Sequence, residues 1–511
     1  MYRSSAKRLS ALIACVGFCL AGASALFAAQ ESQTPKVSLS VKNGKSAPLR
    51  DYRVQGPVVQ RPPREVKNKN LPPKLSAPGT RDTAVQRAFG GASPPPSELG
   101  QFEGGSDAQN QDVIGFRLAP PDTNGDIGPE HYVQYINLIV NIYDRDGNTV
   151  LGPLPGNVFW DGLGDTCETS NDGDPIVMYD QLAQRWFVSQ FAFPNFPGPP
   201  YIQCVAVSAT SDPTGEYNQY QFNLPDTYLN DYPKFGIWPD AYYMTFNGFD
   251  VFGGGFQGGA IALDRTAMLA GDPATMIQFN TGLEGGVLPS DLDGALPPPP
   301  GTPNYFLTYE ISPSRLVMWA FHADFETPGN STFTQLPDLP VDDFVTPVCG
   351  NPRDQCVPQL DSPELLETLS QATMFRLAYR NFGDHQSLVT NQTVGVAPEG
   401  GGGNIAGVRW YELQIPGEAA GDGGATNPWV VHQQSTYSPD SNWRWMGSIA
   451  QDTTATSLSA TASPRPRCSP RSPSPVVSRA TPSVSWARRA SSSRAAEARA
   501  THCRAGATTA P

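Results

Sequence analysis

The sequence predicts an all-β fold, a β-propeller of four-stranded blades, on three observations. The 511 residues include 49 Gly, 51 Pro and 10% aromatic residues, a composition typical of short strands joined by tight turns. Strand-like runs bounded by Gly, Pro, Asn and Asp recur along the middle of the chain, with little helical periodicity. One unit, an apolar strand, a polar turn and an aromatic-rich strand, opens six times, which indicates a repeat architecture.

Residues 1–29 have the features of a secretory signal peptide. Three basic residues lie among the first eight, an apolar stretch covers 11–23, and small residues suited to cleavage follow. The apolar stretch is short for the alternative, a membrane anchor. A lipoprotein box ending at Cys15 would follow too short an apolar run. We therefore expect a secreted protein, extracellular or periplasmic, with no membrane span.

Residues 30–111 are rich in Pro, Ser, Gly, Lys and Arg and contain few large apolar side chains. This composition predicts a flexible leader. Strand-like runs begin at residue 112 and continue to 452, which we take as the propeller domain. Within it, the leucines of 362–370 predict one short helix.

The repeated unit favours a propeller over a β-sandwich, which would not explain one motif recurring six times. Openings are separated by roughly 50 to 80 residues, enough for a four-stranded blade with its loops. Radial closure also removes long exposed strand edges. The openings cover 122–136, 174–191, 231–246, 291–309, 374–390 and 445–450.

The tail, residues 453–511, becomes rich in Arg, Ser, Ala and Pro, and regular aromatics stop. Disorder is the direct interpretation of that composition. A frameshift explains more, because 455–462 in the alternative frame can encode Gly-Asn-Ile-Ala-Leu-Gly-Tyr-Ser, and 504–511 can encode Arg-Trp-Gly-Asp-Tyr-Ser-Ala. We therefore expect the sixth blade to be interrupted and a seventh to be lost.

Charge is distributed unevenly along the chain. The net charge is -13, and nine Arg against one Glu give the tail +8, so the rest carries -13 - 8 = -21. An acidic body excludes nucleic acid as a partner, because phosphate binding requires a basic surface. The acidity also serves to keep a secreted protein in solution.

Four of the eight cysteines lie in the predicted propeller, and an even number in an exported chain predicts disulfides. Cys349 and Cys356 flank a turn-rich segment and are expected to pair, which leaves Cys167 for Cys204. Metal binding is the alternative, but no CxxC or HxxxH spacing is present.

Three segments resemble a group of secreted bacterial β-propeller proteins. They are PPDTNGDIGPEHYVQ at 120–134, RWYEL at 409–413 and RWMGSIA at 444–450. The group's pattern continues with the two segments that the alternative frame restores. The resemblance implies the fold and export but transfers no catalytic residue. Sialidase-like propellers are more distantly similar, since 144–148 matches their Asp box without its Ser and Trp.

Asp122, Asn124 and Asp126 alternate around Gly125, and oxygen ligands at such spacing suit calcium. The later ligands of an EF-hand are missing, and an Asx-rich turn explains the same residues. Calcium is the one cofactor that we expect.

Four acids, Asp122, Asp174, Asp231 and Asp291, each open a repeat. The first strand of a propeller blade lines the central channel, so these carboxyls are expected to converge at one channel mouth. There they would bind a cation or shift each other's pKa. In the alternative, each accepts backbone N–H groups of its own turn.

Arg409, Glu412 and Arg444 lie beside tryptophans at 410, 443 and 445. Arginine stacked on tryptophan, with a carboxylate nearby, can hold a sugar, and the same contacts can join neighbouring blades.

The catalytic residues stay unknown, because neither G-x-S-x-G nor HExxH occurs. The first hypothesis is a monomeric binding or interaction protein for an extracellular carbohydrate or protein ligand. The second is an extracellular carbohydrate-active enzyme, a glycosidase or polysaccharide lyase, with paired carboxylates at the channel mouth.

Overall fold

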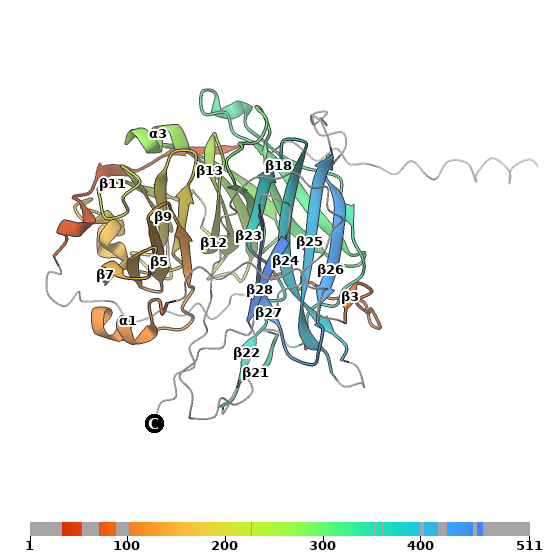
Figure 1. Ribbon diagram of the computed structural model, residues 1–511. Helices are drawn as coiled ribbons and strands as arrows, with labels where there is room; N and C mark the ends of the chain where they lie inside the picture. Colours follow the sequence, from red (N-terminus) through yellow and green to blue (C-terminus); the bar gives the residue numbers. More distant parts are fainter. Residues whose placement is uncertain are drawn as a thin grey trace, which may run out of the picture. The chain divides into compact units, whose positions relative to one another are not determined.

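A computed structural model describes residues 33–53, 71–87, 102–225, 227–350, 354–359, 362–398, 403–416 and 427–452, and the backbone of 457–462 (Figure 1). The chain divides into two compact units, Met1–Gln33 and Thr34–Pro511. The predicted signal peptide, 1–29, lies outside the described residues. Everything below concerns the second unit.

The described part is all-β, as predicted, and its first strands form antiparallel meanders of four consecutive strands. The first meander is β4 (Asn124–Ile127), β5 (His131–Ile136), β6 (Ile139–Asp144) and β7 (Thr149–Pro155). Its β6–β7 turn shows how the sequence folds locally. Gly147 adopts a φ of 87°, and the Asp144 carboxylate accepts the N–H groups of Asp146 and Asn148 at 3.0 and 2.8 Å.

Two further meanders follow the same order, and each gains a fifth strand at its outer edge. The second is β8 (Ile176–Asp180), β9 (Arg185–Ala192), β10 (Ile202–Ser208) and β11 (Tyr217–Asn223). The third is β12 (Leu229–Ile237), β13 (Ala241–Phe249), β14 (Phe256–Asp264) and β15 (Thr275–Gly282).

The fourth and fifth meanders belong to one ten-stranded sheet, because their first strands pair in parallel. The fourth is β16 (Leu288–Asp293), β17 (Asn304–Glu310), β18 (Arg315–His322) and β19 (Thr332–Gln335), with β20 (Leu339–Pro340) also on β18. The fifth is β23 (Thr373–Asn381), β24 (His385–Val396), β25 (Ile405–Pro416) and β26 (Val430–Tyr437). Each predicted opening therefore coincides with the first strand of a meander or, at residue 445, of a hairpin.

Aromatic side chains fill the interfaces between successive meanders. Trp186 of β9 is fully buried in a cluster shared by the first two meanders, 5.0 Å from the Tyr179 ring. Between the second and third, the rings of Phe187 and Phe235 lie 4.9 Å apart. The aromatic-rich second strand of each unit thus supplies the core that holds neighbouring meanders together.

The expected flexible leader, 30–111, is corrected where it is described. β1 (Lys36–Leu39) pairs with β15, β2 (Lys42–Lys45) pairs with β11, and β3 (Val85–Gln86) pairs in parallel with β26. The outer strand of each meander offers free backbone groups, so these polar segments become strands by hydrogen bonding with few apolar side chains. Residues 30–32, 54–70 and 88–101 lie outside the described ranges.

Two other expectations need correction. The predicted helix at 362–370 is instead β22 (Ser362–Glu367), which pairs with β21 (Gln355–Gln359). Hydrogen bonding to the neighbouring strand overrides the helical spacing of the leucines. The tail contains β28 (Ser457–Ala462), which pairs antiparallel with β27 (Trp445–Gln451), so this part of the tail forms a strand (Figure 1). Residues 463–511 are not described, and the frameshift stays a prediction.

Both predicted disulfides are confirmed. Cys167 of α2 (Thr166–Thr169) is bonded to Cys204 of β10, with Cα atoms 5.7 Å apart. Cys349 is bonded to Cys356, with Cα atoms 6.3 Å apart. Across the described ranges, no helix is long and apolar enough to cross a membrane.

Candidate functional site

Three of the four repeat-opening acids gather around one lysine. Asp122, Asp174 and Asp231, which precede or begin the first strands of three successive meanders, all act electrostatically on the Lys234 ammonium of β12. That ammonium also lies 3.9 Å above the ring of Tyr232. We call these five residues the carboxylate–lysine cluster.

Hydrogen bonds from one asparagine link the acids of the cluster. The Asn137 amide nitrogen donates to the Asp122 carboxylate at 2.6 Å, and its oxygen accepts the Asp174 N–H at 3.0 Å. The Asp174 carboxylate in turn accepts the Tyr232 N–H at 3.1 Å. Three meanders are therefore joined through polar contacts at one place, rather than each acid capping only its own turn.

The backbone of the cluster is strained at three non-glycine positions. Asp122, Asp174 and Tyr232 have φ angles of 37°, 47° and 56°, in the left-handed region. Such conformations cost about 1–3 kcal/mol each and persist only where the surrounding structure enforces them. Holding these three residues in this conformation therefore lowers the stability of the folded protein.

The electrostatics of the cluster are set by desolvation and then by the charges. Solvent reaches Asp122, yet the surrounding protein desolvates its carboxyl enough to raise its pKa, against the opposing effect of Lys234. Desolvation lowers the pKa of half-buried Lys234, and the three aspartates oppose this shift. Desolvation by the surrounding protein raises the pKa of the Tyr232 phenol, and the three acids raise it further.

The fourth predicted acid, Asp291, belongs to a separate ion cluster. It is bonded to Arg376 of β23, which also lies 2.7 Å from Asp293, and it accepts the Ile237 N–H at 2.9 Å. Burial raises the pKa of Asp291 to about 6, although Arg376 opposes the shift. Asp126 of β4 acts on the same group.

The three predicted calcium ligands point to different partners. Asn124 accepts the Val177 N–H at 2.7 Å, and Asp126 accepts the Tyr179 N–H at 2.8 Å, so both join β4 to β8. Asp122 belongs to the carboxylate–lysine cluster. These contacts satisfy backbone groups between meanders, and calcium binding at Asp122, Asn124 and Asp126 stays a prediction.

One other group of ligand-type side chains lies close together among the described residues. Ligand atoms of Cys349, Asp354 and Cys356 lie within 4.8 Å of one another, but the two sulfurs are bonded to each other. The buried Asp354 carboxylate accepts the N–H groups of Val348 and Cys349 at 2.9 and 2.8 Å. Its role here is to hold the disulfide loop.

The predicted arginine and glutamate candidates are buried with partners inside the protein. Arg409 is fully buried, 3.3 Å from Asp82, and its guanidinium stacks on Tyr411 rather than on tryptophan. Glu412 accepts the Gln414 amide at 2.8 Å. Arg444 contacts both carboxylate oxygens of Asp440 at 2.6 and 2.9 Å. These contacts join strands, and sugar binding by Arg409, Glu412 and Arg444 stays a prediction.

Sequence reasoning missed the basic members of both clusters, Lys234 and Arg376. A signal for Lys234 existed, since it interrupts the otherwise apolar opening DYPKFGIW at 231–238 in a chain poor in lysine. Arg376 gave no such signal, because its acidic partner is 85 residues away in sequence.

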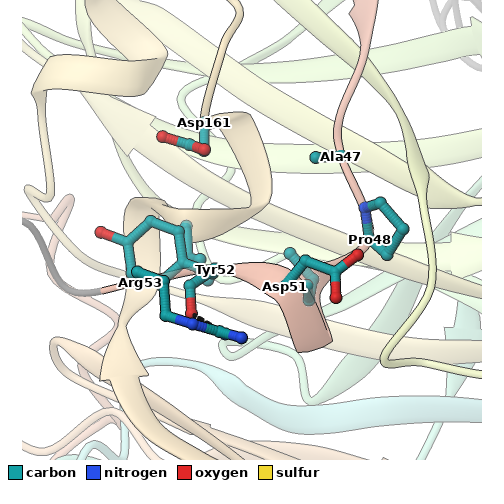
Figure 2. Close-up of a pocket in the computed structure, with 8 residues that line it drawn as sticks. Ala47, Pro48, Asp51, Tyr52, Arg53 and Asp161 are labelled. Atoms are coloured by element: carbon teal, nitrogen blue, oxygen red, sulfur yellow. Dashed lines mark hydrogen bonds between the residues drawn. The ribbon is translucent and has the colours of Figure 1, made fainter.

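A small pocket lies where η1 (Leu49–Asp51) meets η2 (Gly156–Trp160), and no residue of the carboxylate–lysine cluster lines it. Its volume is about 200 Å³, and Figure 2 shows Tyr52, Arg53 and Asp161 around it. Burial, and then Asp161, raise the pKa of Tyr52. Its full lining is Ala47, Pro48, Leu49, Asp51, Tyr52, Arg53, Val158 and Asp161.

No protein-family model and no curated protein matches this sequence. Among solved structures, the chain is similar to an exo-β-1,3-galactanase from Clostridium thermocellum, at 12% identity and a TM-score of 0.30, over 68% of this chain and 73% of that one. A GH43 endo-arabinanase from Bacillus licheniformis matches at 12% identity and a TM-score of 0.25, over 57% and 93%. Drosophila semaphorin 2a matches at 12% identity and a TM-score of 0.29, over 77% and 75%. Likeness at this level carries no argument about function, and the resemblance to secreted bacterial propellers stays an expectation.

Proposed function

We propose that this chain is a secreted, monomeric β-propeller that binds an extracellular carbohydrate at the carboxylate–lysine cluster. The observation that carries the proposal is that Asn137, Asp174 and Tyr232, from three successive meanders, are hydrogen-bonded in series beside Asp122, close enough for the three acids to act on Lys234. Residues from different repeats meet at one place when their first strands surround a common axis. Two disulfides agree with an oxidising compartment outside the cytoplasm.

Contacts between first strands support the propeller itself. Side chains of β4 accept N–H groups of β8, Asp291 of β16 accepts an N–H of β12, and β16 pairs in parallel with β23. First strands that follow one another side by side are what a propeller requires. In this proposal β27 and β28 begin a sixth blade, and the frameshift removes its continuation and a seventh.

The chemistry of the cluster suits a polyhydroxylated ligand. Three carboxyls accept hydrogen bonds, while the Lys234 ammonium donates them and the Tyr232 phenol does both. Sugar hydroxyls also donate and accept, so they can satisfy both kinds of group. The strained backbone keeps these groups in place before the ligand arrives, which lowers the entropy cost of binding.

A carbohydrate-active enzyme, a glycosidase or polysaccharide lyase, is the second candidate, and one observation favours it. The pKa of Asp122 is raised while Asp174 and Asp231 lie in the same cluster. A group of carboxyls in which one has a raised pKa is the arrangement that general acid–base cleavage of a glycosidic bond uses.

The test is a panel of purified polysaccharides, measured for retention of the full chain and for release of reducing ends or unsaturated products. D174N keeps an oxygen that can accept the Tyr232 N–H but removes the charge. It should weaken retention at least tenfold without changing Tm by more than a few degrees. D144N, in the β6–β7 turn, is the matched control and should bind normally. Equal retention by D174N would refute the proposed site, and product release would establish the second candidate.

Calcium binding at Asp122, Asn124 and Asp126 has its own measurement. A ligand that binds only the folded state raises stability, so Tm should rise in millimolar calcium and fall on chelation. Asn124→Ala should remove the difference. A Tm that is the same with calcium and with chelator would contradict the site.

A further inference from the structure

The N-terminal segment 71–87 lies along the fourth and fifth meanders and contacts both. The Ser76 hydroxyl donates to the Phe344 carbonyl at 3.1 Å, and its N–H donates to the Thr346 carbonyl at 2.9 Å. Asp82 is ion-paired with Arg409 of β25, and β3 continues the sheet beyond β26. We call this segment the strap.

Lys74 is the buried attachment of the strap to the fourth meander. Its ammonium donates to the Tyr309 carbonyl at 2.5 Å and to the Thr308 hydroxyl at 3.1 Å. Two carboxylates flank it, Glu284 at 3.5 Å and Glu310 at 3.6 Å. The same ammonium lies 4.5 Å from the centroid of the Tyr309 ring. One negative charge is enough to balance the Lys74 ammonium, but two carboxyl groups flank it.

We propose that the strap is a releasable clasp, fastened by Lys74 and opened when both flanking carboxyls, Glu284 and Glu310, carry a charge. With Glu284 neutral, Lys74 and Glu310 form a balanced pair inside the protein. With Glu284 ionised, the site holds an unmatched negative charge where Lys74 is buried and both carboxylates are only partly exposed, which costs free energy that fuller hydration relieves.

The titration of Glu284 agrees with this geometry. Desolvation raises its pKa to about 7; Lys74 opposes the shift and Glu310 adds to it. If opening exposes Glu284 to water, its pKa falls toward the ordinary value, so proton binding favours the closed clasp. Burial also lowers the pKa of Lys74, and loss of that proton at alkaline pH works in the opposite sense. The remaining titratable group at the site is Tyr309, whose pKa burial raises.

Release has a defined structural consequence. β3 pairs only with the end of β26, where the N–H groups of Thr436 and Ser438 donate to the carbonyls of Ala84 and Gln86, so an open clasp frees these backbone groups. The clasp would therefore couple a rise in pH to exposure of the strap and of the end of β26 that it pairs with.

Hydrogen exchange of the full chain, followed by mass spectrometry and corrected for intrinsic rates, tests the clasp. Between pH 5.5 and pH 8, protection of 71–87 and of the Thr436 and Ser438 amides should fall about tenfold or more, while β10 stays unchanged as a reporter of global folding. E284Q mimics the protonated acid and should keep the strap protected at both pH values.

The matched control is E216Q. Glu216 directly precedes β11 and forms an exposed ion pair, at 2.5 Å, with Lys45 of β2, away from the strap. This variant should retain the full pH dependence of the native chain. Constant protection in the native chain, a rise with pH, or an unchanged pH dependence in E284Q would each overturn the proposal.

Discussion

Arg376 is the side chain on which the second ion cluster depends. It bonds both Asp291 and Asp293, and both carboxylates are almost fully buried. Arg376→Gln should lower the free energy of unfolding at pH 7 by about 3 kcal/mol, because two buried acids lose their cation. The loss should be smaller at pH 5, because burial raises the pKa of Asp291 to about 6 and the variant lacks the cation that opposes this shift, so Asp291 takes up a proton. Urea unfolding at both pH values measures this.

Arg315→Gln is the comparison for that experiment. Arg315 pairs with Asp338 at 2.8 Å, but both side chains are partly open to solvent. Exposed pairs contribute about 0–1 kcal/mol, so this variant should remain close to the native chain. Equal losses in the two variants would contradict the role given to burial at Arg376.

The acids of the candidate site could be predicted from the sequence, whereas their partners could not. Asp122, Asp174 and Asp231 were identifiable because each opens a repeat. That Asp291 would leave the group depended on Arg376, and no local pattern reveals a contact between β16 and β23. Propensity and residue spacing reflect contacts between residues close in sequence, whereas these ion pairs join residues far apart in sequence.

At the scale of elements, two meanders approach each other closely at Gly236 of β12. A Cβ there would lie 2.2 Å from the Ser290 carbonyl oxygen of β16. Because backbone cannot rotate away as a side chain can, Gly236→Ala should cost about 1–3 kcal/mol. Thermal unfolding measures the loss, with Gly329→Ala as control, since a Cβ at that glycine meets nothing within 4 Å. A native Tm for Gly236→Ala would contradict the close approach.

The two disulfides should contribute unequally. Cys167–Cys204 closes a loop with a sequence separation of 37, against 7 for Cys349–Cys356. Chain-entropy reasoning gives about 4 kcal/mol for the longer loop and about 2.5 kcal/mol for the shorter one. Paired serine variants, unfolded in urea, should therefore differ in midpoint, with the Cys167/Cys204 pair the less stable. The reverse order would show that strain or residual structure outweighs loop length.

The type of each element could be predicted where the periodic pattern was strong. The prediction failed where pairing with another strand determined the structure. The openings at 122, 174, 231, 291, 374 and 445 each mark the first strand of a meander or hairpin. The 362–370 segment and the leader failed for one reason. Both contain strands because a neighbouring strand has backbone groups free to pair with them. Amino-acid composition does not show which strands will be neighbours.

Over the whole molecule, the shifted acids predict a stability maximum in mild acid. Asp291 and Glu284 have raised folded pKa values of about 6 and about 7. Their stabilising contribution is complete below their unfolded pKa values and is lost as pH rises through the folded ones. Asp440, whose pKa Arg444 lowers to about 2, contributes only above its unfolded value. Tm should therefore be higher near pH 5 than at pH 8 and should fall below about pH 4. Scanning fluorimetry from pH 3 to 9 checks this, and a maximum above pH 7 would contradict it.

The pairing of the N-terminal strands with later meanders has a consequence for the order of folding. The contact between Ser435 and Ala84 joins residues 351 apart, so the strap cannot find its place until β26 exists. Closing so large a loop is entropically costly and slow compared with forming local hairpins. A chain that emerges N-terminus first must carry the strap unpaired until β26 has been made, whereas β2 can pair as soon as β11 exists. β1 and β2 are rich in lysine and contain few apolar side chains, as a linker does. This composition keeps them in solution without aggregation before they pair. Refolding should accordingly end with a slow phase in which the strap, residues 71–87, gains protection last.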